Sequence, residues 1–190
     1  MAITAQDVKA LRDATGAGMM DAKRALITAE GDAEAAKQIL REKGLAKAAG
    51  RGDRQNDEGV VALAVGDGVA AIVRIKTETD FSAKNEVIRT MASQLAEAVL
   101  EKGPEAVEDF RGALDDLRLT IKENLDFGEI ERVEAAAGNT LDTYLHVQDG
   151  RGVNAVVVEG TGVAADNLHQ VALHIAFAKP LYLTTDEVPA

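Results

Sequence analysis

Three histidines, His146, His169 and His174, are the side chains best suited to acid–base catalysis or metal binding in this chain. His169 and His174 are five residues apart, which is about 140° around a helix of 3.6 residues per turn, so they do not converge on one metal ion. Cysteine is absent, which excludes thiolate nucleophiles and Cys-based zinc sites. No Gly-x-x-x-x-Gly-Lys-Ser/Thr sequence occurs, which excludes triphosphate binding by a P-loop. We therefore expect no catalytic residue, no cofactor and no metal, and we do not expect an enzyme.

Thr79-Asp80-Phe81-Ser82 stands out because one of only four phenylalanines follows an acid where a strand is expected to turn into a helix. One interpretation is structural, with Asp80 capping the helix and Phe81 in the core. The other is functional, with an aromatic wedge and a charge presented to a partner at a rigid junction. The local pattern leaves both open.

Gly16-Ala17-Gly18-Met19-Met20 is the second unusual segment, because two adjacent methionines begin a helix directly after a glycine-rich turn. Both methionines could pack at the domain edge. Alternatively, at least one of them presents flexible apolar surface to a partner, since both cannot face inward on a thin domain.

The charge distribution divides the chain that carries these segments into two modules. Residues 1–54 have a net charge of +2, whereas residues 55–190 have a net charge of −13. Helix caps at Thr4 and Asp32 and glycines at 16, 18, 31 and 44 predict three short helices within residues 1–44. Residues 45–56 are predicted to be a linker, and residues 57–190 a second domain.

The second domain is predicted to begin with a β-hairpin over Val60–Val65 and Val69–Ile75, turning at Gly66-Asp67-Gly68. An apolar stripe from Val87 to Val99 and a second helical pattern from Val107 to Leu125 predict a helical hairpin. Strands follow within residues 130–158, and a last helix spans about Ala165–Ala178 before Pro180. The fold class is α+β, with a small antiparallel sheet covered by helices.

Composition limits the partners. The chain has 190 residues, 46% of them hydrophobic, and a formal net charge of −11 with a pI near 4.7. A strongly negative chain repels the phosphate backbone of nucleic acids, so no nucleic acid is expected as a partner. No apolar run is long enough to span a membrane, and the N-terminus does not resemble a signal peptide, so we expect no membrane partner and a cytoplasmic location.

The order and spacing of four segments resemble the elongation factor Ts family across nearly the whole chain. They are Leu11–Leu26, Gly31-Asp32, Glu78–Asn85 and His174–Pro180. The resemblance implies an N-terminal ubiquitin-associated-like domain of three helices, followed by a core that binds elongation factor Tu, both GDP-bound and nucleotide-free, and promotes GDP release during translation elongation.

In that family the Thr-Asp-Phe segment disturbs the Mg²⁺ and nucleotide site of the GTPase, and the resemblance assigns this role to Thr79, Asp80, Phe81 and Ser82. It assigns partner binding to Gly16, Gly18, Met19, Met20 and His174.

The chain departs from the family pattern in three places. Ser82 stands where valine is common, Asn154 occupies a strand that is usually aliphatic, and Gln170 replaces a histidine. The resemblance is to a short form with length for one core subdomain, which leaves two assemblies open: a non-covalent homodimer, or a monomer whose last helix covers the sheet. Two other functional classes also stay open, an enzyme using His174 and an RNA-binding module using residues 41–54.

Overall fold

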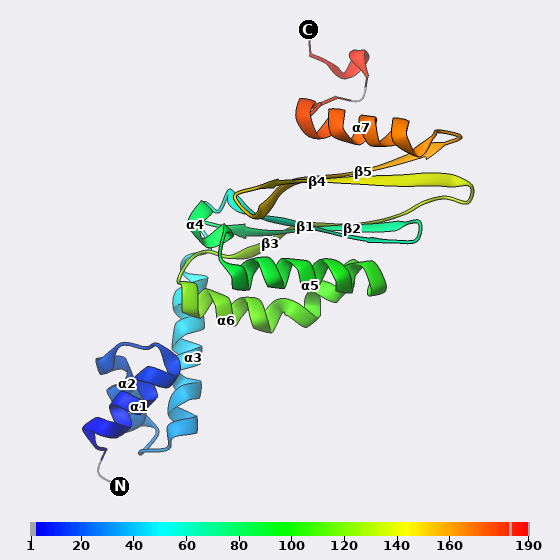
Figure 1. The fold of residues 1–190 in the computed structure, drawn as a ribbon. Coiled ribbons are helices and arrows are strands. Elements are labelled where there is room, and N and C mark those ends of the chain that lie inside the picture. Colours follow the sequence, from blue (N-terminus) through cyan, green and yellow to red (C-terminus); the bar gives the residue numbers. More distant parts are fainter. Residues whose placement is uncertain (1–2, 183, 190) are drawn as a thin grey trace. The chain divides into compact units, whose positions relative to one another are not determined.

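The computed structural model describes residues 3–182 and 184–189, and the chain is α+β (Figure 1). Its described residues form two compact units. One comprises the chain up to Gln55 together with Gly112–Asn124, and the other comprises Asn56–Arg111 together with the chain from Leu125 onward.

The first unit begins with three helices: α1 (Ala5–Thr15), α2 (Met19–Thr28) and α3 (Ala33–Ala49). The predicted caps are confirmed. Thr4 and Asp7 form a reciprocal capping box before α1, and the Asp32 side chain accepts from two backbone N–H groups at the start of α3. The helices enclose a small aliphatic core of Val8, Leu11, Ala22, Ala25, Leu26 and Ala36.

Helix α3 does not end before Gly44 as the sequence predicts, but continues to Ala49, so the first five residues of the predicted linker are helical. Gly44 is accommodated because the side chain of Leu119, in α6 (Arg111–Ile121), occupies the space that a Cβ would fill. Arg41 also forms an ion pair with Asp116 at 2.5 Å. Close packing and charge pairing thus outweigh the low helix propensity of glycine.

The segment after α5 (Glu86–Lys102) also differs from the single helix expected over residues 107–125. A 3₁₀ helix, η1 (Pro104–Phe110), comes first, and α6 follows. From Gly112 onward α6 belongs to the first unit, where Asn124 donates hydrogen bonds to the carbonyls of Gly52 (3.1 Å) and Arg54 (2.7 Å).

The second unit contains two antiparallel sheets rather than one. The first has the order β1 (Glu58–Gly66), β2 (Val69–Thr77), β3 (Asp126–Glu134), and the second pairs β4 (Asn139–Gln148) with β5 (Arg151–Thr161). The predicted hairpin turn at Gly66–Gly68 is confirmed, with Gly68 at φ +66°.

Helices cover the outer faces of both sheets. Helix α5 packs on β1 and β2, whereas α7 (Ala165–Ala178, as predicted) packs on β4 and β5 (Figure 1). Met91, Leu95 and Val99 are buried as expected, but Val87 is exposed and the neighbouring Ile88 is buried instead. The last described element is the 3₁₀ turn η2 (Thr185–Glu187).

The two sheets meet where β5 crosses β1. A Cβ added to Gly152 of β5 would collide with the carbonyl oxygen of Val61 in β1, so the two main chains are in contact at this point. Only glycine allows such an approach.

Candidate functional site

The Thr79–Ser82 segment forms a single helical turn, α4 (Asp80–Ala83), directly after β2. Thr79, rather than Asp80, is its N-cap: the Thr79 Oγ1 accepts from the backbone N–H of Ser82 at 3.1 Å. The Thr77 hydroxyl donates to the Thr79 carbonyl at 2.7 Å, and Thr77 is fully buried. These bonds fix the backbone of the turn to the end of a core strand.

Phe81 projects from this turn with 84% of its surface exposed, whereas Ser82 and Ala83 are buried. The interpretation that Phe81 lies in the core is therefore wrong. Ser82 faces inward, so its replacement of the common valine does not reduce the exposed apolar tip. The exposed Phe81 side chain is therefore free to contact another molecule.

Asp80, next to Phe81, is held by a salt bridge. Its Oδ2 lies 2.9 Å from the Nζ of Lys84, which caps the C-terminal end of the same turn. Lys84 also contacts Asp149 at 3.2 Å. The hydrogen bond from Lys84 lowers the pKa of Asp80, and the two carboxylates, Asp80 foremost, raise the pKa of Lys84. Asp80 is therefore ionised at neutral pH.

Gly16 and Gly18 form the turn between α1 and α2. Gly16 is the left-handed C-cap of α1 (φ +65°), and Gly18 is the N-cap of α2. Met19 and Met20 follow on α2 with 47% and 60% of their surfaces exposed. Both methionines present part of their surface to solvent at the edge of this unit.

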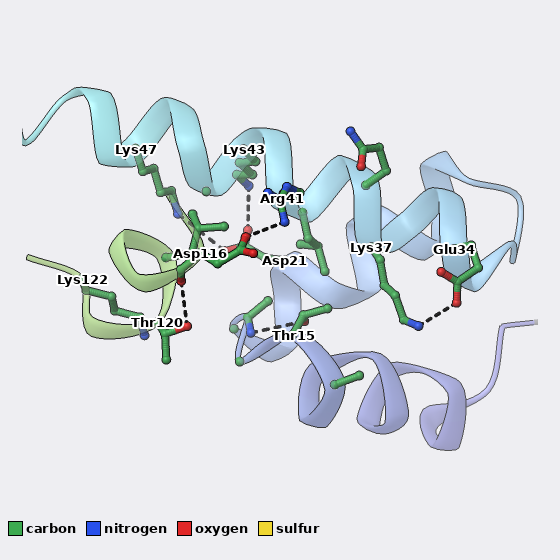
Figure 2. Close-up of a pocket in the computed structure, with 18 of the residues that line it drawn as sticks. Thr15, Asp21, Glu34, Lys37, Arg41, Lys43, Lys47, Asp116, Thr120 and Lys122 are labelled. Atoms are coloured by element: carbon green, nitrogen blue, oxygen red, sulfur yellow. Dashed lines mark hydrogen bonds and ion pairs between the residues drawn. The ribbon is translucent and has the colours of Figure 1, made fainter. Parts of the chain in front are cut away.

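A cavity of about 660 Å³ lies beside this turn, and Gly16 and Gly18 line it (Figure 2). Its walls come from the α1–α2 turn, α3 and the C-terminal part of α6. Six cationic side chains line it, Lys37, Arg41, Lys43, Lys47, Arg51 and Lys122, against three acidic ones, Asp21, Glu34 and Asp116. The cavity is therefore positively charged in a chain of strongly negative charge.

Asp21 is the main internal anion of this cavity. Its carboxylate contacts Arg24 at 2.6 Å, Lys43 at 2.7 Å and Lys47 at 3.7 Å. The hydrogen bonds from Lys43 and then Arg24 hold the pKa of Asp21 well below the ordinary value for an aspartate. One carboxylate shared among three cations leaves net positive charge at the cavity wall.

His174 lies in the second unit, exposed near the C-terminal end of α7. The side chain of Asn154 in β5 donates to the carbonyl of Ala176 at 3.1 Å and fixes this end of the helix. The next residue, Phe177, is 90% exposed. Because Lys84 reaches the turn that precedes β5 and Asn154 lies on β5 itself, α4 and the end of α7 are attached to the same end of that strand.

The predicted residues thus form two groups, one in each unit. Gly16, Gly18, Met19 and Met20 lie together in the first unit, and Thr79–Ser82 and His174 lie in the second. In the described part of the chain, no group of three or more His, Asp or Glu side chains is arranged to hold a metal ion. His169 pairs with Asp142 at 3.0 Å instead.

Sequence reasoning missed two features of these groups. The cationic cavity was signalled only by the positive charge of residues 1–54. The contact of Asp149 with Lys84 joins positions 65 residues apart, and no spacing pattern in the sequence indicates it.

Among residues 3–182 and 184–189, no helix is both long and apolar enough to cross a membrane.

Phe81 in the second unit, and Met19 and Met20 in the first, are exposed apolar side chains that another macromolecule could contact. Residues 78–190 match the Elongation factor TS family. The chain is 45% identical to the elongation factor Ts of Dinoroseobacter shibae, over 97% of this chain and 66% of the relative. It is 40% identical to that of Clavibacter michiganensis subsp. michiganensis, over 98% of this chain and 71% of the relative.

The elongation factor Ts of Colwellia psychrerythraea is likewise 40% identical, over the whole of this chain and 66% of the relative. The chain thus spans about two thirds of the length of these relatives. It belongs to the elongation factor Ts family, whose members are elongation factors of protein biosynthesis.

Proposed function

We propose that this chain is a guanine nucleotide exchange factor that binds elongation factor Tu, GDP-bound or nucleotide-free, in the cytoplasm and promotes GDP release. The observation that carries the proposal is the exposure of Phe81 on a turn that is capped and fixed to a core strand. The family membership supports the identity of the partner.

The mechanism is one of linked binding equilibria. Insertion of Phe81 beside the Mg²⁺ and phosphate site of the GTPase favours an open state that holds GDP weakly. Asp80, ionised next to Phe81, adds a negative charge close to phosphate oxygens and to the ligands of the metal ion. The coupling is reciprocal: bound factor lowers the affinity of elongation factor Tu for GDP, and bound GDP lowers its affinity for the factor by the same ratio. No covalent step occurs, so the chain acts as an exchange factor and not as an enzyme.

Partner binding involves both units in this proposal. Met19 and Met20 supply adaptable apolar contacts, and the cationic cavity beside Gly16 and Gly18 favours an acidic surface on the partner. His174 contributes a further contact near the end of α7.

The test is the release of a fluorescent GDP analogue from elongation factor Tu at millimolar Mg²⁺, with and without the chain. We expect strong acceleration that saturates with factor concentration. We expect much less acceleration in excess EDTA, because the metal ion that the factor displaces is then already gone. A release rate that the chain leaves unchanged at every concentration would contradict the proposal.

We further propose that two chains associate as a non-covalent homodimer. Helix α7 and the segment after it present Val171, Phe177 and Leu181 to the surface, and burial of such side chains between two copies would be favourable. Sedimentation over a hundredfold dilution is the test: we expect dissociation to a 20.0 kDa chain. A 20.0 kDa species already at high concentration, alone and active in exchange, would contradict the dimer and favour the monomer.

A further inference from the structure

The turn between β4 and β5, Asp149-Gly150-Arg151, lies against the helical turn α4 that presents Phe81. Lys84 connects them, with its Nζ 2.9 Å from an oxygen of Asp80 and 3.2 Å from an oxygen of Asp149. Lys84 is the C-cap of α4, so this contact fixes the end of α4 that its N-cap does not.

The β4–β5 turn is itself firmly held. Arg89 of α5 donates to the Gly150 carbonyl at 2.7 Å. Arg151 donates to the Gly59 carbonyl in β1 and contacts Glu58 at 3.0 Å, and its side chain is 13% exposed. Asp149 and Gly150 both have positive φ, which fixes a tight turn. A turn bonded to α5 and to β1 is a rigid support for anything attached to it.

We propose that Asp149 and Lys84 are positioning residues for nucleotide exchange: through their ion pair the β4–β5 turn holds α4 in the orientation that directs Phe81 and Asp80 at the partner. This inference rests on the proposed exchange function. It adds to that function a support from a segment 65 residues away along the chain.

The ion pair serves orientation rather than overall stability. Its side chains are 35% and 62% exposed, and exposed pairs contribute little to the free energy of unfolding. The N-terminal end of α4 is already fixed by Thr79, and Ser82 and Ala83 are buried, so the ion pair acts on the C-terminal end of α4, where Lys84 lies. Lys84 contacts both carboxylates at once, so Asp149 and Asp80 are joined through one side chain.

The experiment compares Asp149→Asn, Lys84→Met and the double variant with the natural chain. Asparagine suits the position because it tolerates the positive φ of Asp149 (+52°) and removes the negative charge while keeping the size of the side chain. Lys84→Arg serves as a rescue variant. Lys102→Met is the matched control, because it removes an exposed ion pair with Asp109 (3.4 Å) in the same unit, away from α4.

The first measurement is amide hydrogen exchange in the free protein at Ala83 and Lys84, whose N–H groups bond within α4. We expect exchange to rise about two- to fivefold in Asp149→Asn, the range that corresponds to an exposed ion pair. Lys102→Met leaves these amides unchanged. Unchanged exchange in Asp149→Asn would overturn the proposal whether or not the partner is correctly identified.

The second measurement is GDP release from elongation factor Tu. We expect each single variant to lower the release rate at saturating factor about two- to fivefold, with little change in the half-saturating concentration. The double variant should lose no more than the larger single loss, and Lys84→Arg should retain most of the rate. Normal release by Asp149→Asn, or additive losses, would overturn the proposal.

The two measurements separate this inference from the proposed function. If the natural chain fails to accelerate GDP release while amide exchange at α4 still responds to Asp149→Asn, the exchange function is wrong, and what stands is only that the ion pair holds α4 in place. If the natural chain is active and Asp149→Asn is normal in both measurements, only the positioning role is wrong.

Discussion

Replacement of Phe81 by alanine separates the functional interpretation of α4 from a structural one. About one sixth of the Phe81 surface is covered within the chain. A phenylalanine buries about 150–250 Å² when fully enclosed, so roughly 25–40 Å² is buried here. At about 25 cal/mol per Å² the substitution costs at most about 1 kcal/mol of folding free energy. The expected fall in Tm is no more than about 4 °C for a chain of this size.

The expected effect on exchange is larger, because most of the Phe81 surface is free to be buried by the partner. Central aromatic anchors of interfaces contribute about 2 kcal/mol or more. At 1.4 kcal/mol per tenfold change, we expect Phe81→Ala to slow GDP release at saturating factor by roughly 30-fold or more. Asp80→Ala in the same chain should slow release further.

The assay is stopped-flow release of labelled GDP from elongation factor Tu, with thermal unfolding measured on the same samples. Phe177→Ala serves for comparison, since Phe177 is similarly exposed but lies on α7, in the surface proposed for the homodimer. It should change the half-saturating concentration more than the saturating rate. Normal release by a folded variant lacking both Phe81 and Asp80 would refute the reasoning. A fall in Tm well beyond 4 °C would show that Phe81 stabilises the fold.

Three further outcomes are expected. Met19→Lys should weaken binding to elongation factor Tu severalfold while Tm changes little, because the side chain is exposed; loss of the folded state would show that Met19 is structural. Asp32→Ala should cost about 1 kcal/mol by removing the cap of α3, measured by urea unfolding; an unchanged midpoint would contradict that role. The depressed pKa of Asp21 stabilises the folded state above the ordinary aspartate pKa, and this contribution is lost as pH falls through the folded value. Lys43→Met should therefore raise the pKa of Asp21, followed by NMR titration, and a pKa unmoved by that change would refute the assigned cause.

Local signals in the sequence predicted local structure well. The capping box at Thr4, the cap at Asp32 and the glycine turn after β1 each depend on residues within four positions of one another, so their types determine the conformation. The apolar pattern of α7 gave its limits because α7 is a regular helix that ends before Pro180.

Long-range packing was not predictable in the same way. Glycine is typical of a helix end, yet α3 continues through Gly44. The side chain of Leu119 packs into the space that a Cβ of residue 44 would fill, and no residue near Gly44 in the sequence indicates this contact. The division of the strands into two sheets depends equally on distant contacts.

The candidate site shows the same division. The residue types at Phe81 and Met19 identified unusual segments, but exposure decides between a core and a surface role. Exposure is set by the whole fold rather than by neighbours in the sequence. The ion pair between Asp149 and Lys84 joins the β4–β5 turn to α4, and the sequences of these two segments show no pattern that would predict the contact.

The contact of Gly152 with the main chain of β1 has a consequence for the cooperativity of unfolding in the second unit. An isolated two-stranded hairpin such as β4–β5 is at best marginally stable in water. Here it lies directly on β1 without an intervening side chain at the crossing, and Arg151 is bonded to the same strand. Although the two sheets share no backbone ladder in the described residues, the hairpin β4–β5 is supported by β1 on one face and by α7 on the other. The unit should therefore behave as one foldon, with native-state opening of β5 and of β1 governed by the same free energy.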